Sequence, residues 1–469
     1  MKDYRYSVFT SSIEAKITTG VLKPGDKLPS VRRIKEEYNL STSSVQSGYD
    51  YLVFKGLVMS IPRSGYVVAA QTKKISGEPQ IDLPPIPRDP IFRENVILTS
   101  NIKQHAEFAS LNAATPSDFF VPQKLVLRTM QQVIREKGAA LLRYYPTNGT
   151  DELRELLTRR SAGHGARVQP EELLITDGAL QALYIALAIT TTPNDIIAVE
   201  SPCVFSVLEV IANLRLRTIE IPVRNKEGFD TDYLKNVCDK NAVKAIVLTP
   251  NFHNPTGLLL TDERKKEVLA IASHHHIPII ENDVYGDLYF RNPRPSNIRN
   301  FDTSGSVITF SSFSKTIAPG IRLGWMAAGR FLSKAERMKF SLGRSVSPLN
   351  QEVIAKLLGS ATYDRHLRTF RRELERQAIQ LAGQFSSYFP ENTYTEIPQG
   401  GYSIWNKLSA DVDMQGFYKS CETLGIHFTP GTTFSFTDAY DHCFRTIFSQ
   451  RITAASIDAI KTLGCSLAP

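Results

Sequence analysis

Cysteine is scarce in this chain of 469 residues, and the few that occur form no recognisable ligand set. They are odd in number, they stand far apart, and none forms a Cys-x-x-Cys pair: Cys203, Cys238, Cys421, Cys443 and Cys465. This pattern argues against a disulfide framework and against a zinc site. We therefore expect no metal in this protein and a reducing, cytoplasmic environment.

Long hydrophobic runs are also missing from the sequence. No stretch of 18 apolar residues could cross a bilayer, and the N-terminus MKDYRYSVFT lacks the apolar core of a signal peptide. We expect no membrane partner. The composition, 42% hydrophobic and 22% charged, is that of an ordinary globular protein, and the length allows two or three domains. The net charge of +8 is a mild indication of a polyanionic partner.

The first seventy residues have the pattern of a small separate domain. Phe9, Ile13 and Ile17 recur at four-residue spacing and predict a helix over residues 6–19. Ser30 and Ser41 are candidate N-caps of a second and a third helix. Two short apolar runs around a Pro-Arg-Ser-Gly turn then predict a two-stranded wing. Three helices and a wing are typical of a winged helix-turn-helix, an α+β domain.

This segment resembles the DNA-binding domain of the GntR family of regulators. The matching positions are residues 24–32, Val45, Tyr49, Leu52, Gly56 and the wing residues 65–68. The resemblance implies that residues 1–70 bind double-stranded DNA and that a homodimer reads two promoter half-sites. The alternative is a helical protein-interaction module with a solvated basic face.

The charge of this segment suits a nucleic-acid partner. Residues 1–70 hold ten Lys or Arg and six Asp or Glu, a net charge of +4. We expect Arg32 and Arg63 to hold phosphates or to enter the minor groove. Family members often carry an arginine just inside the recognition helix, where this chain has hydroxyl residues. Base readout would therefore rest on four other side chains: Thr42, Ser43, Ser44 and Gln46.

A change of pattern divides the rest of the chain. Residues 71–90 hold five prolines and little apolar periodicity, which predicts a semi-rigid linker. From residue 91 to residue 469, helical patterns alternate with short apolar strands. This alternation predicts an α/β domain whose mostly parallel central sheet is covered on both faces.

One stretch of this large domain has the features of a cofactor anchor. The β-branched run at residues 307–310 predicts a buried strand, and Lys315 follows it. Lys315 would form a Schiff base with the aldehyde of pyridoxal 5'-phosphate (PLP). Ser312, Ser314 and Arg322 would hold the phosphate. The plain alternative is a surface lysine on a polar loop.

Three other strand ends carry residues that fit the same cofactor. Gly178, Ala179 and Leu180 open a helix whose backbone amides could approach a phosphate. Asn254 and Tyr285 could hydrogen-bond the phenolic oxygen of PLP, and Asp283 could pair with its pyridinium nitrogen. Each of these motifs taken alone is also typical of an ordinary turn or loop mouth.

Taken together, the motifs resemble fold-type-I aminotransferases over nearly all of residues 91–469. The order Gly178, Asn254, Asp283, Tyr285, Lys315, Arg322 and Arg445 carries this resemblance, supported by Tyr144. It implies a small C-terminal α/β subdomain, an effector or substrate carboxylate on Arg445, and a Tyr144 that reaches the phosphate in the other subunit. Related chains stack an aromatic ring on the cofactor, where this chain has Val204 and then Phe205.

A GntR-type winged helix followed by an aminotransferase-like domain is similar to the MocR-like subgroup of transcription regulators. This resemblance implies a homodimer in which each DNA-binding domain lies against the partner's large domain. It also implies a regulator that senses PLP or an amino-acid or amine effector. A working aminotransferase with an accessory DNA-binding domain is the alternative, because no group essential for transamination is missing. A large domain that has lost the cofactor and only dimerises is a weaker hypothesis.

Overall fold

The computed structural model describes residues 6–23, 25–54, 57–61, 65–68, 83–91, 109–166, 168–224, 228–291, 293–395 and 398–467. Arg63 and residues 71–82, on which two of the predictions fall, lie outside these ranges. Within them, no helix of 18 or more residues has a stretch that is apolar enough to cross a membrane.

The N-terminal domain has the predicted winged helix-turn-helix fold. Its helices are α1 (Ser7–Thr18), α2 (Val31–Glu37) and α3 (Thr42–Phe54), and its wing pairs β1 (Val58–Ile61) with β2 (Gly65–Val68) in antiparallel fashion. Both predicted caps are present, because the Ser30 and Ser41 hydroxyls accept hydrogen bonds from backbone N–H groups three residues on, at 3.3 and 3.1 Å. The predicted fold of this domain is confirmed.

The core of this domain is tightly packed. A Cβ atom on Gly48 of α3 would lie 2.2 Å from the Phe9 ring of α1, so only glycine allows the two helices to approach so closely. Tyr49 of α3 stacks on Tyr66 of the wing with ring centroids 4.1 Å apart. Helix α3 is therefore fixed against both α1 and the wing.

The large domain is built on an eight-stranded sheet in the order β4-β11-β10-β9-β8-β5-β6-β7. The pairs β10/β9, β9/β8, β8/β5 and β5/β6 are parallel, while β11 and the short edge strand β7 are antiparallel to their neighbours. The strands are β4 (Leu173–Thr176), β5 (Ile196–Ser201), β6 (Arg217–Arg224), β7 (Gly228–Phe229), β8 (Val243–Leu248), β9 (Ile279–Asn282), β10 (Val307–Ser312) and β11 (Gly324–Ala327). The predicted mostly parallel sheet is confirmed.

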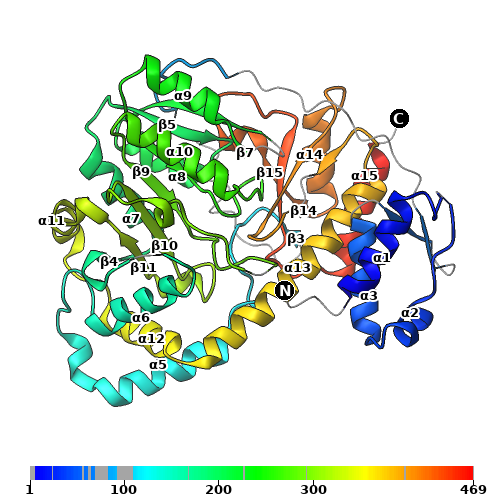
Figure 1. The fold of residues 1–469 in the computed structure, drawn as a ribbon, viewed down its shortest axis with the longest axis horizontal. Coiled ribbons are helices and arrows are strands. Elements are labelled where there is room, and N and C mark those ends of the chain that lie inside the picture. The colour runs from blue at the N-terminus through cyan, green and yellow to red at the C-terminus, as the bar shows by residue number, and fades with distance from the viewer. Residues whose placement is uncertain are drawn as a thin grey trace.

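Helices cover both faces of this sheet (Figure 1). Alternate residues of β5 show why: Ile197 and Val199 join one buried apolar cluster, and Ala198 joins another. The helices are α5 (Gln123–Lys137), α6 (Asp151–Ala162), α7 (Ala179–Thr190), α8 (Phe205–Asn213), α9 (Thr231–Lys240), α10 (Asp262–His274), α11 (Leu332–Gly343) and α12 (Pro348–Leu358).

A small C-terminal subdomain adjoins the sheet. Its four strands, in the order β12-β13-β16-β15, are β12 (Tyr394–Thr395), β13 (Ser403–Lys407), β15 (Thr429–Pro430) and β16 (Cys443–Ile447), and all three pairs are antiparallel. Strand β14 (Ile426–His427) pairs with β3 (Ala109–Ser110) from the start of the large domain. Helices α14 (Met414–Thr423) and α15 (Ala454–Ser466) complete the subdomain.

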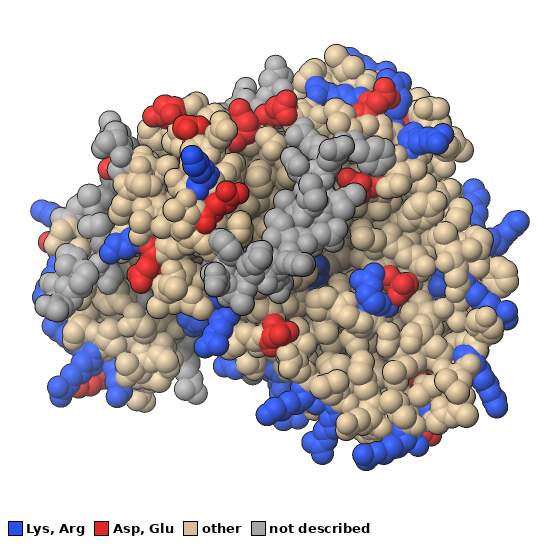
Figure 2. Space-filling view, turned by 180° about the vertical axis from the view of Figure 1, so that it is seen from behind, with Lys and Arg blue, Asp and Glu red and all other residues tan. Residues whose placement is uncertain are grey.

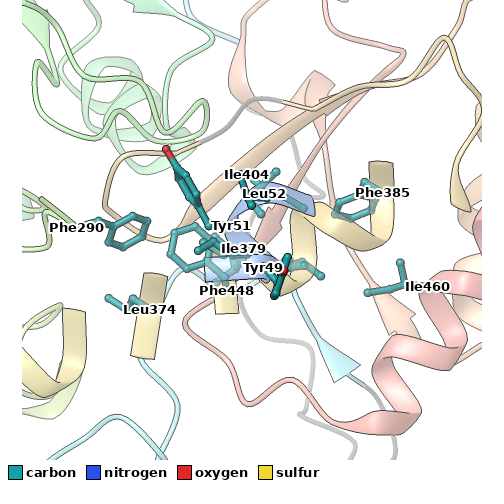
Figure 3. Close-up of a cluster of buried hydrophobic side chains, with 14 of the residues drawn as sticks. Tyr49, Tyr51, Leu52, Phe290, Leu374, Ile379, Phe385, Ile404, Phe448 and Ile460 are labelled. Carbon is teal, nitrogen blue, oxygen red and sulfur yellow. The ribbon is translucent and has the colours of Figure 1, made fainter. Parts of the chain in front are cut away.

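Helix α13 (Ala361–Tyr388) is the longest helix that the structure describes, with 28 residues. It runs from the large domain to the winged domain (Figure 1) and packs against α12, α15 and α3. Tyr51 and Leu52 of α3 share one buried cluster with Leu374 and Ile379 of α13 (Figure 3). The winged domain therefore docks on the helix that borders the small subdomain.

This docking takes place within a single chain. The resemblance to MocR-like regulators predicts instead that the domain lies against the partner's large domain. In the structure, the Arg291 guanidinium of the same chain lies 5.3 Å from the centre of the Tyr51 ring. Exchange of this domain between two subunits remains a prediction.

The end of the predicted linker also packs on the large domain. Leu83 is buried and its carbonyl accepts a hydrogen bond from the Tyr233 hydroxyl, and Arg88 pairs with Thr218 of β6. These contacts lie before residue 91. The last residues of the predicted linker are therefore packed on the large domain.

Candidate functional site

The predicted cofactor residues follow four strands of the central sheet: three neighbours, β8, β9 and β10, and the edge strand β4. Asp283 and Tyr285 follow β9, Lys315 follows β10, and Asn254 follows β8. Gly178 follows the parallel-running edge strand β4. Because the carboxyl ends of parallel strands lie at the same edge, the fold gathers these residues in one place.

The phosphate end of the site is formed by the start of α7 and by Arg322. Gly178 is the N-cap of α7 and has no side chain to satisfy the first backbone N–H groups, which are free for an anion. Arg322 lies directly over it: a Cβ on Gly178 would be 2.7 Å from Arg322 Nη2, which donates to the Asp177 carbonyl at 3.0 Å. Ala179 and Leu180 occupy the first turn, and Leu180 is exposed.

The two predicted serines belong to the same corner. Ser312 is buried and its hydroxyl lies 3.2 Å from the Leu323 carbonyl and 3.0 Å from the Ser314 hydroxyl. Leu323 stands next to Arg322. The structure thus brings Gly178, Ser312, Ser314 and Arg322 into adjoining positions, as the sequence predicts for a phosphate cradle.

Lys315 is held with a weakened proton affinity. Burial, with the nearby positive charges of Arg445 and Arg322, lowers its pKa to about 8. Its Nζ donates to the Ala114 carbonyl at 2.6 Å. The deprotonated amine is the form of lysine that attacks an aldehyde, and a lowered pKa increases its fraction.

Asp283 is buried, and both of its carboxylate oxygens accept hydrogen bonds. Asn251 Nδ2 donates to Oδ1 at 3.0 Å, and Arg294 Nη2 forms an ion pair with Oδ2. Arg294 also pairs with Asp287 at 2.7 Å. Burial alone would raise the pKa of Asp287, but Arg294 outweighs it and lowers that pKa to about 2. One guanidinium therefore pairs with the buried carboxylate of Asp283 and the half-buried carboxylate of Asp287.

Tyr285, Asn254 and Arg445 form a continuous chain of hydrogen bonds. Asn254 Nδ2 donates to the Tyr285 hydroxyl at 3.3 Å, and Arg445 Nη1 donates to Asn254 Oδ1 at 2.9 Å. Burial raises the pKa of Tyr285 to about 12, so its hydroxyl keeps its proton and can donate it to an acceptor. The predicted partners of a phenolic oxygen thus lie together.

Arg445 is fully buried in the small subdomain, on β16. Its Nη2 donates to Thr429 Oγ1 at 3.0 Å and to the Asn112 carbonyl, and its guanidinium lies 4.9 Å from the centre of the Phe434 ring. Burial lowers its pKa to about 10, which leaves it charged at neutral pH. Its Nε–H has no acceptor among the described residues. The carboxylate that the sequence predicts for Arg445 would supply an acceptor to this donor.

These residues fit PLP. The free amides of α7 suit its phosphate, the carboxylate of Asp283 suits its ring nitrogen, and the chain of donors at Tyr285 suits its phenolic oxygen. A metal site has no such support: among the described residues, no three His, Cys, Asp or Glu side chains group to bind a metal ion.

Two predicted cofactor contacts are not brought to this cluster. The half-buried ring of Phe205 opens α8 and packs 6.1 Å from the Phe434 ring, with Val204 buried beside it as the N-cap. Tyr144 is 76% exposed and lies under the Arg344 guanidinium, 4.6 Å from its ring centre. Their cofactor contacts therefore remain predictions.

Several groups that shape the site were not predicted from the sequence. Ala114 and Asn112 contribute only backbone carbonyls, which leave no mark on the residue type. Asn251 and Arg294 hold Asp283. The signal for these two was available, because a buried carboxylate requires donors, but the sequence does not say which side chains supply them.

The predicted DNA contacts lie at the start of α3. Thr42 and Ser43 are exposed, and Ser44 is half-buried beside Ser41. Gln46 is exposed but its amide already donates to the Tyr66 hydroxyl of the wing. The Arg32 side chain on α2 is almost fully exposed and pairs with Glu36 at 3.3 Å. Figure 2 shows Lys and Arg side chains gathered along the lower edge of the molecule, including the winged domain.

Two family models match this chain. The model described as "Bacterial regulatory proteins, gntR family" matches residues 6–68, and the model described as "Aminotransferase class I and II" matches residues 111–460. The chain belongs to the aminotransferase class I and II family over residues 111–460 and carries a GntR-type DNA-binding domain at residues 6–68. The MocR-like architecture predicted from the sequence is thereby confirmed.

Relatives match this chain over both of its domains. It is 31% identical over 467 residues to the uncharacterized HTH-type transcriptional regulator YjiR of Escherichia coli, covering 98% of each chain. It is 29% identical to the HTH-type transcriptional regulator NorG of Staphylococcus aureus, covering 86% of this chain and 92% of that one. A kynurenine aminotransferase of Pyrococcus horikoshii has the same fold over 80% of this chain and 95% of its own, with a TM-score of 0.75 at 24% identity.

Proposed function

We propose that this protein is a DNA-binding transcription regulator whose large domain binds PLP and responds to it or to an amino-acid or amine effector. The observation that carries the proposal is the cluster of Lys315, Asp283, Asn254, Tyr285 and Arg322 at one sheet edge, joined by α13 to a winged helix-turn-helix. The names of the relatives, which are transcriptional regulators, support it.

Each residue has a defined part in this proposal. PLP supplies an aldehyde and an electron-withdrawing pyridine ring when it is bound. Lys315, with a pKa of about 8, has a larger neutral fraction than an ordinary lysine, and this neutral amine can bond to an aldehyde. Arg322 and the amides of α7 bind a phosphate, Asp283 stabilises a protonated ring nitrogen, and Tyr285 donates to a phenolic oxygen. Arg445 offers its unpaired Nε–H to the carboxylate of an effector.

Absorbance of the purified protein tests the cofactor. PLP-supplemented protein should show the visible band of lysine-bound PLP, and Lys315→Ala should lose it. Gel-shift titrations with DNA from upstream of the protein's own coding region test DNA binding. Absence of the visible band in supplemented wild-type protein would refute the assignment of the large domain.

A second candidate function is that of a working PLP-dependent aminotransferase. The specific observation in its favour is that the site holds both a Lys315 of lowered pKa and a fully buried Arg445 for a carboxylate. Turnover of pooled amino acids with a keto-acid acceptor separates the two. Sustained turnover that is unaffected by deleting the winged domain would favour the enzyme.

We also propose that the protein is a homodimer through an exposed apolar face of the large domain. Leu142, Tyr144, Phe340 and Leu342 are all exposed, and the Arg344 guanidinium lies 4.6 Å from the Tyr144 ring centre and 5.8 Å from that of Phe340. A contiguous patch of this kind is what a second copy would bury. This face also carries Tyr144, the residue predicted to reach the other subunit's cofactor.

The oligomeric state tests this proposal. Leu142→Asp places a charge on a side chain that is 88% exposed, so it should not disturb folding but should shift the protein to monomer in light scattering. Val21→Asp, at an exposed valine before the winged domain's second helix, is the matched control. A photo-crosslinking residue at Tyr51 then shows which chain receives the winged domain. We expect a product of monomer mass, and a product of dimer mass would show exchange between subunits.

A further inference from the structure

One face of α13 links the loop of Lys315 to the winged domain. His366, Phe370 and Leu374 recur at four-residue spacing, so they lie on the same face of the helix. Leu374 lies about 12 Å along the helix axis from His366, at 1.5 Å per residue. Neighbouring members of this row touch, because the His366 and Phe370 rings stack with centroids 5.5 Å apart.

The first end of this row holds the backbone next to Lys315. His366 Nε2 lies 2.8 Å from the Thr316 carbonyl, and the Tyr363 hydroxyl donates to Thr316 Oγ1 at 3.2 Å. A carbonyl oxygen can only accept, so Nε2 carries the proton. Burial lowers the pKa of His366, which favours this neutral form. Two side chains of α13 therefore grip the residue that follows Lys315.

A residue next to β13 of the small subdomain holds the preceding carbonyl. The Tyr402 hydroxyl donates to the carbonyl of Lys315 itself. The Tyr402 ring lies 5.5 Å from that of Tyr285 and 6.2 Å from that of Phe370. Phe370 therefore lies against both His366 and Tyr402. His366 holds the Thr316 carbonyl, and Tyr402 links the Lys315 backbone to the Tyr285 ring. The backbone of Lys315 cannot move without disturbing this part of α13.

The second end of the row meets the winged domain. Leu374 and Ile379 belong to the buried cluster that also contains Tyr51 and Leu52 of α3 (Figure 3). Packed interiors transmit small shifts rather than absorb them. A displacement of α13 near Thr316 is therefore expected to move the residues of α13 on which α3 packs.

We propose that His366 and Tyr363 are positioning residues that couple the state of Lys315 to the DNA-binding domain through α13. This inference rests on the proposed function and specifies its regulation. The backbone at Lys315 and Thr316 takes one position when the Lys315 side chain is bound to PLP and another when an amine releases it. The hydrogen bonds from α13 carry that difference to α3. A ligand that distinguishes the two arrangements then changes DNA affinity by its differential binding.

The experiment compares four variants of the full-length protein, each with and without PLP. His366→Leu removes the donor but fills the space, while His366→Gln restores an N–H. Thr369→Val changes an exposed residue of the same helix and serves as the control. The readouts are PLP affinity from absorbance and DNA affinity by fluorescence anisotropy. Their combination gives the ratio of DNA affinities with and without PLP.

His366→Leu should bind PLP and DNA but show a ratio reduced about two- to tenfold toward unity, the loss expected for one hydrogen bond. His366→Gln should recover much of the ratio, and Thr369→Val should equal the wild type. Tyr363→Phe, which alters one oxygen atom only, should repeat the loss. A full ratio in both His366→Leu and Tyr363→Phe would overturn the inference. Failure of the wild type to bind PLP or DNA would instead overturn the proposed function.

Discussion

Replacement of Gly178 by alanine tests the phosphate cradle at its tightest point. Gly178 has φ 88° and ψ 177°, a region that is open essentially to glycine alone. Adopting it costs any other residue about 1–3 kcal/mol. The added Cβ would also stand 2.7 Å from Arg322 Nη2, which must move away. The substitution therefore combines backbone strain with the displacement of a phosphate-binding guanidinium.

These two effects appear in different measurements. The backbone strain lowers the free energy of unfolding of the protein without PLP, by about 1–3 kcal/mol in urea titrations. The displaced Arg322 loses a charge-assisted hydrogen bond to phosphate, a loss of about 1.5–3 kcal/mol, or roughly ten- to 150-fold in PLP affinity. Absorbance titration measures that affinity.

Gly165→Ala is the matched control for Gly178→Ala. Gly165 has a similar φ of 78°, but its added Cβ would meet the nearest atom, Asn300 Nδ2, at an ordinary 3.5 Å. It should lower stability and leave PLP affinity unchanged. If Gly178→Ala binds PLP as tightly as Gly165→Ala does, Arg322 and the start of α7 do not hold the phosphate.

Changes of pH and three further substitutions test other parts of the structure. Because the pKa of Lys315 is about 8, the rate of PLP attachment in stopped-flow absorbance should rise with pH from 7 to 9 and then level off. Arg32→Ala should weaken binding to every DNA sequence and reduce the salt slope by about one, whereas Gln46→Ala should change sequence preference. Arg294→Met leaves the buried Asp283 carboxylate without its ion pair and should lower the free energy of unfolding by about 3–5 kcal/mol. The stability that Asp287 gains from its pKa of about 2 is present above pH 4 and lost as the pH falls toward 2, and this loss should vanish in Arg294→Met.

Local pattern was sufficient for most of the fold. The four-residue spacing of Phe9, Ile13 and Ile17 gave α1, and all three side chains are buried in the winged domain. The apolar run at residues 307–310 gave β10, because a strand buried on both faces needs no polar alternation. Docking of α3 on α13 could not be predicted, since it joins residues more than 300 positions apart and no periodicity records such a contact.

The same division applies to the site. Lys315, Asp283 and Asn254 were predicted because each ends a recognisable strand, and parallel strands bring their ends together. The Arg294 pair with Asp283 was not predicted, because Arg294 follows a loop whose path the sequence does not specify. Phe205 shows what sequence spacing cannot predict. It stands near the expected position in the sequence, but its ring packs on Phe434, which comes from another subdomain.

The two halves of α3 have separate tasks, and this separation restricts what PLP can change. Thr42 and Ser43 at its start are exposed, where the sequence predicts base contacts, while Tyr51 and Leu52 near its end are buried in the cluster shared with α13. A movement of α13 therefore shifts the whole winged domain without altering its reading surface. A dimeric helix-turn-helix protein reads half-sites about 34–36 Å apart, or multiples of that distance, so such a shift alters the preferred spacing. We expect PLP to change affinity for paired half-sites of varied spacing in anisotropy titrations, and to leave affinity for a single half-site unchanged. An equal effect of PLP on single and paired sites would mean that the reading surface itself is altered, against the rigid docking of α3 on α13.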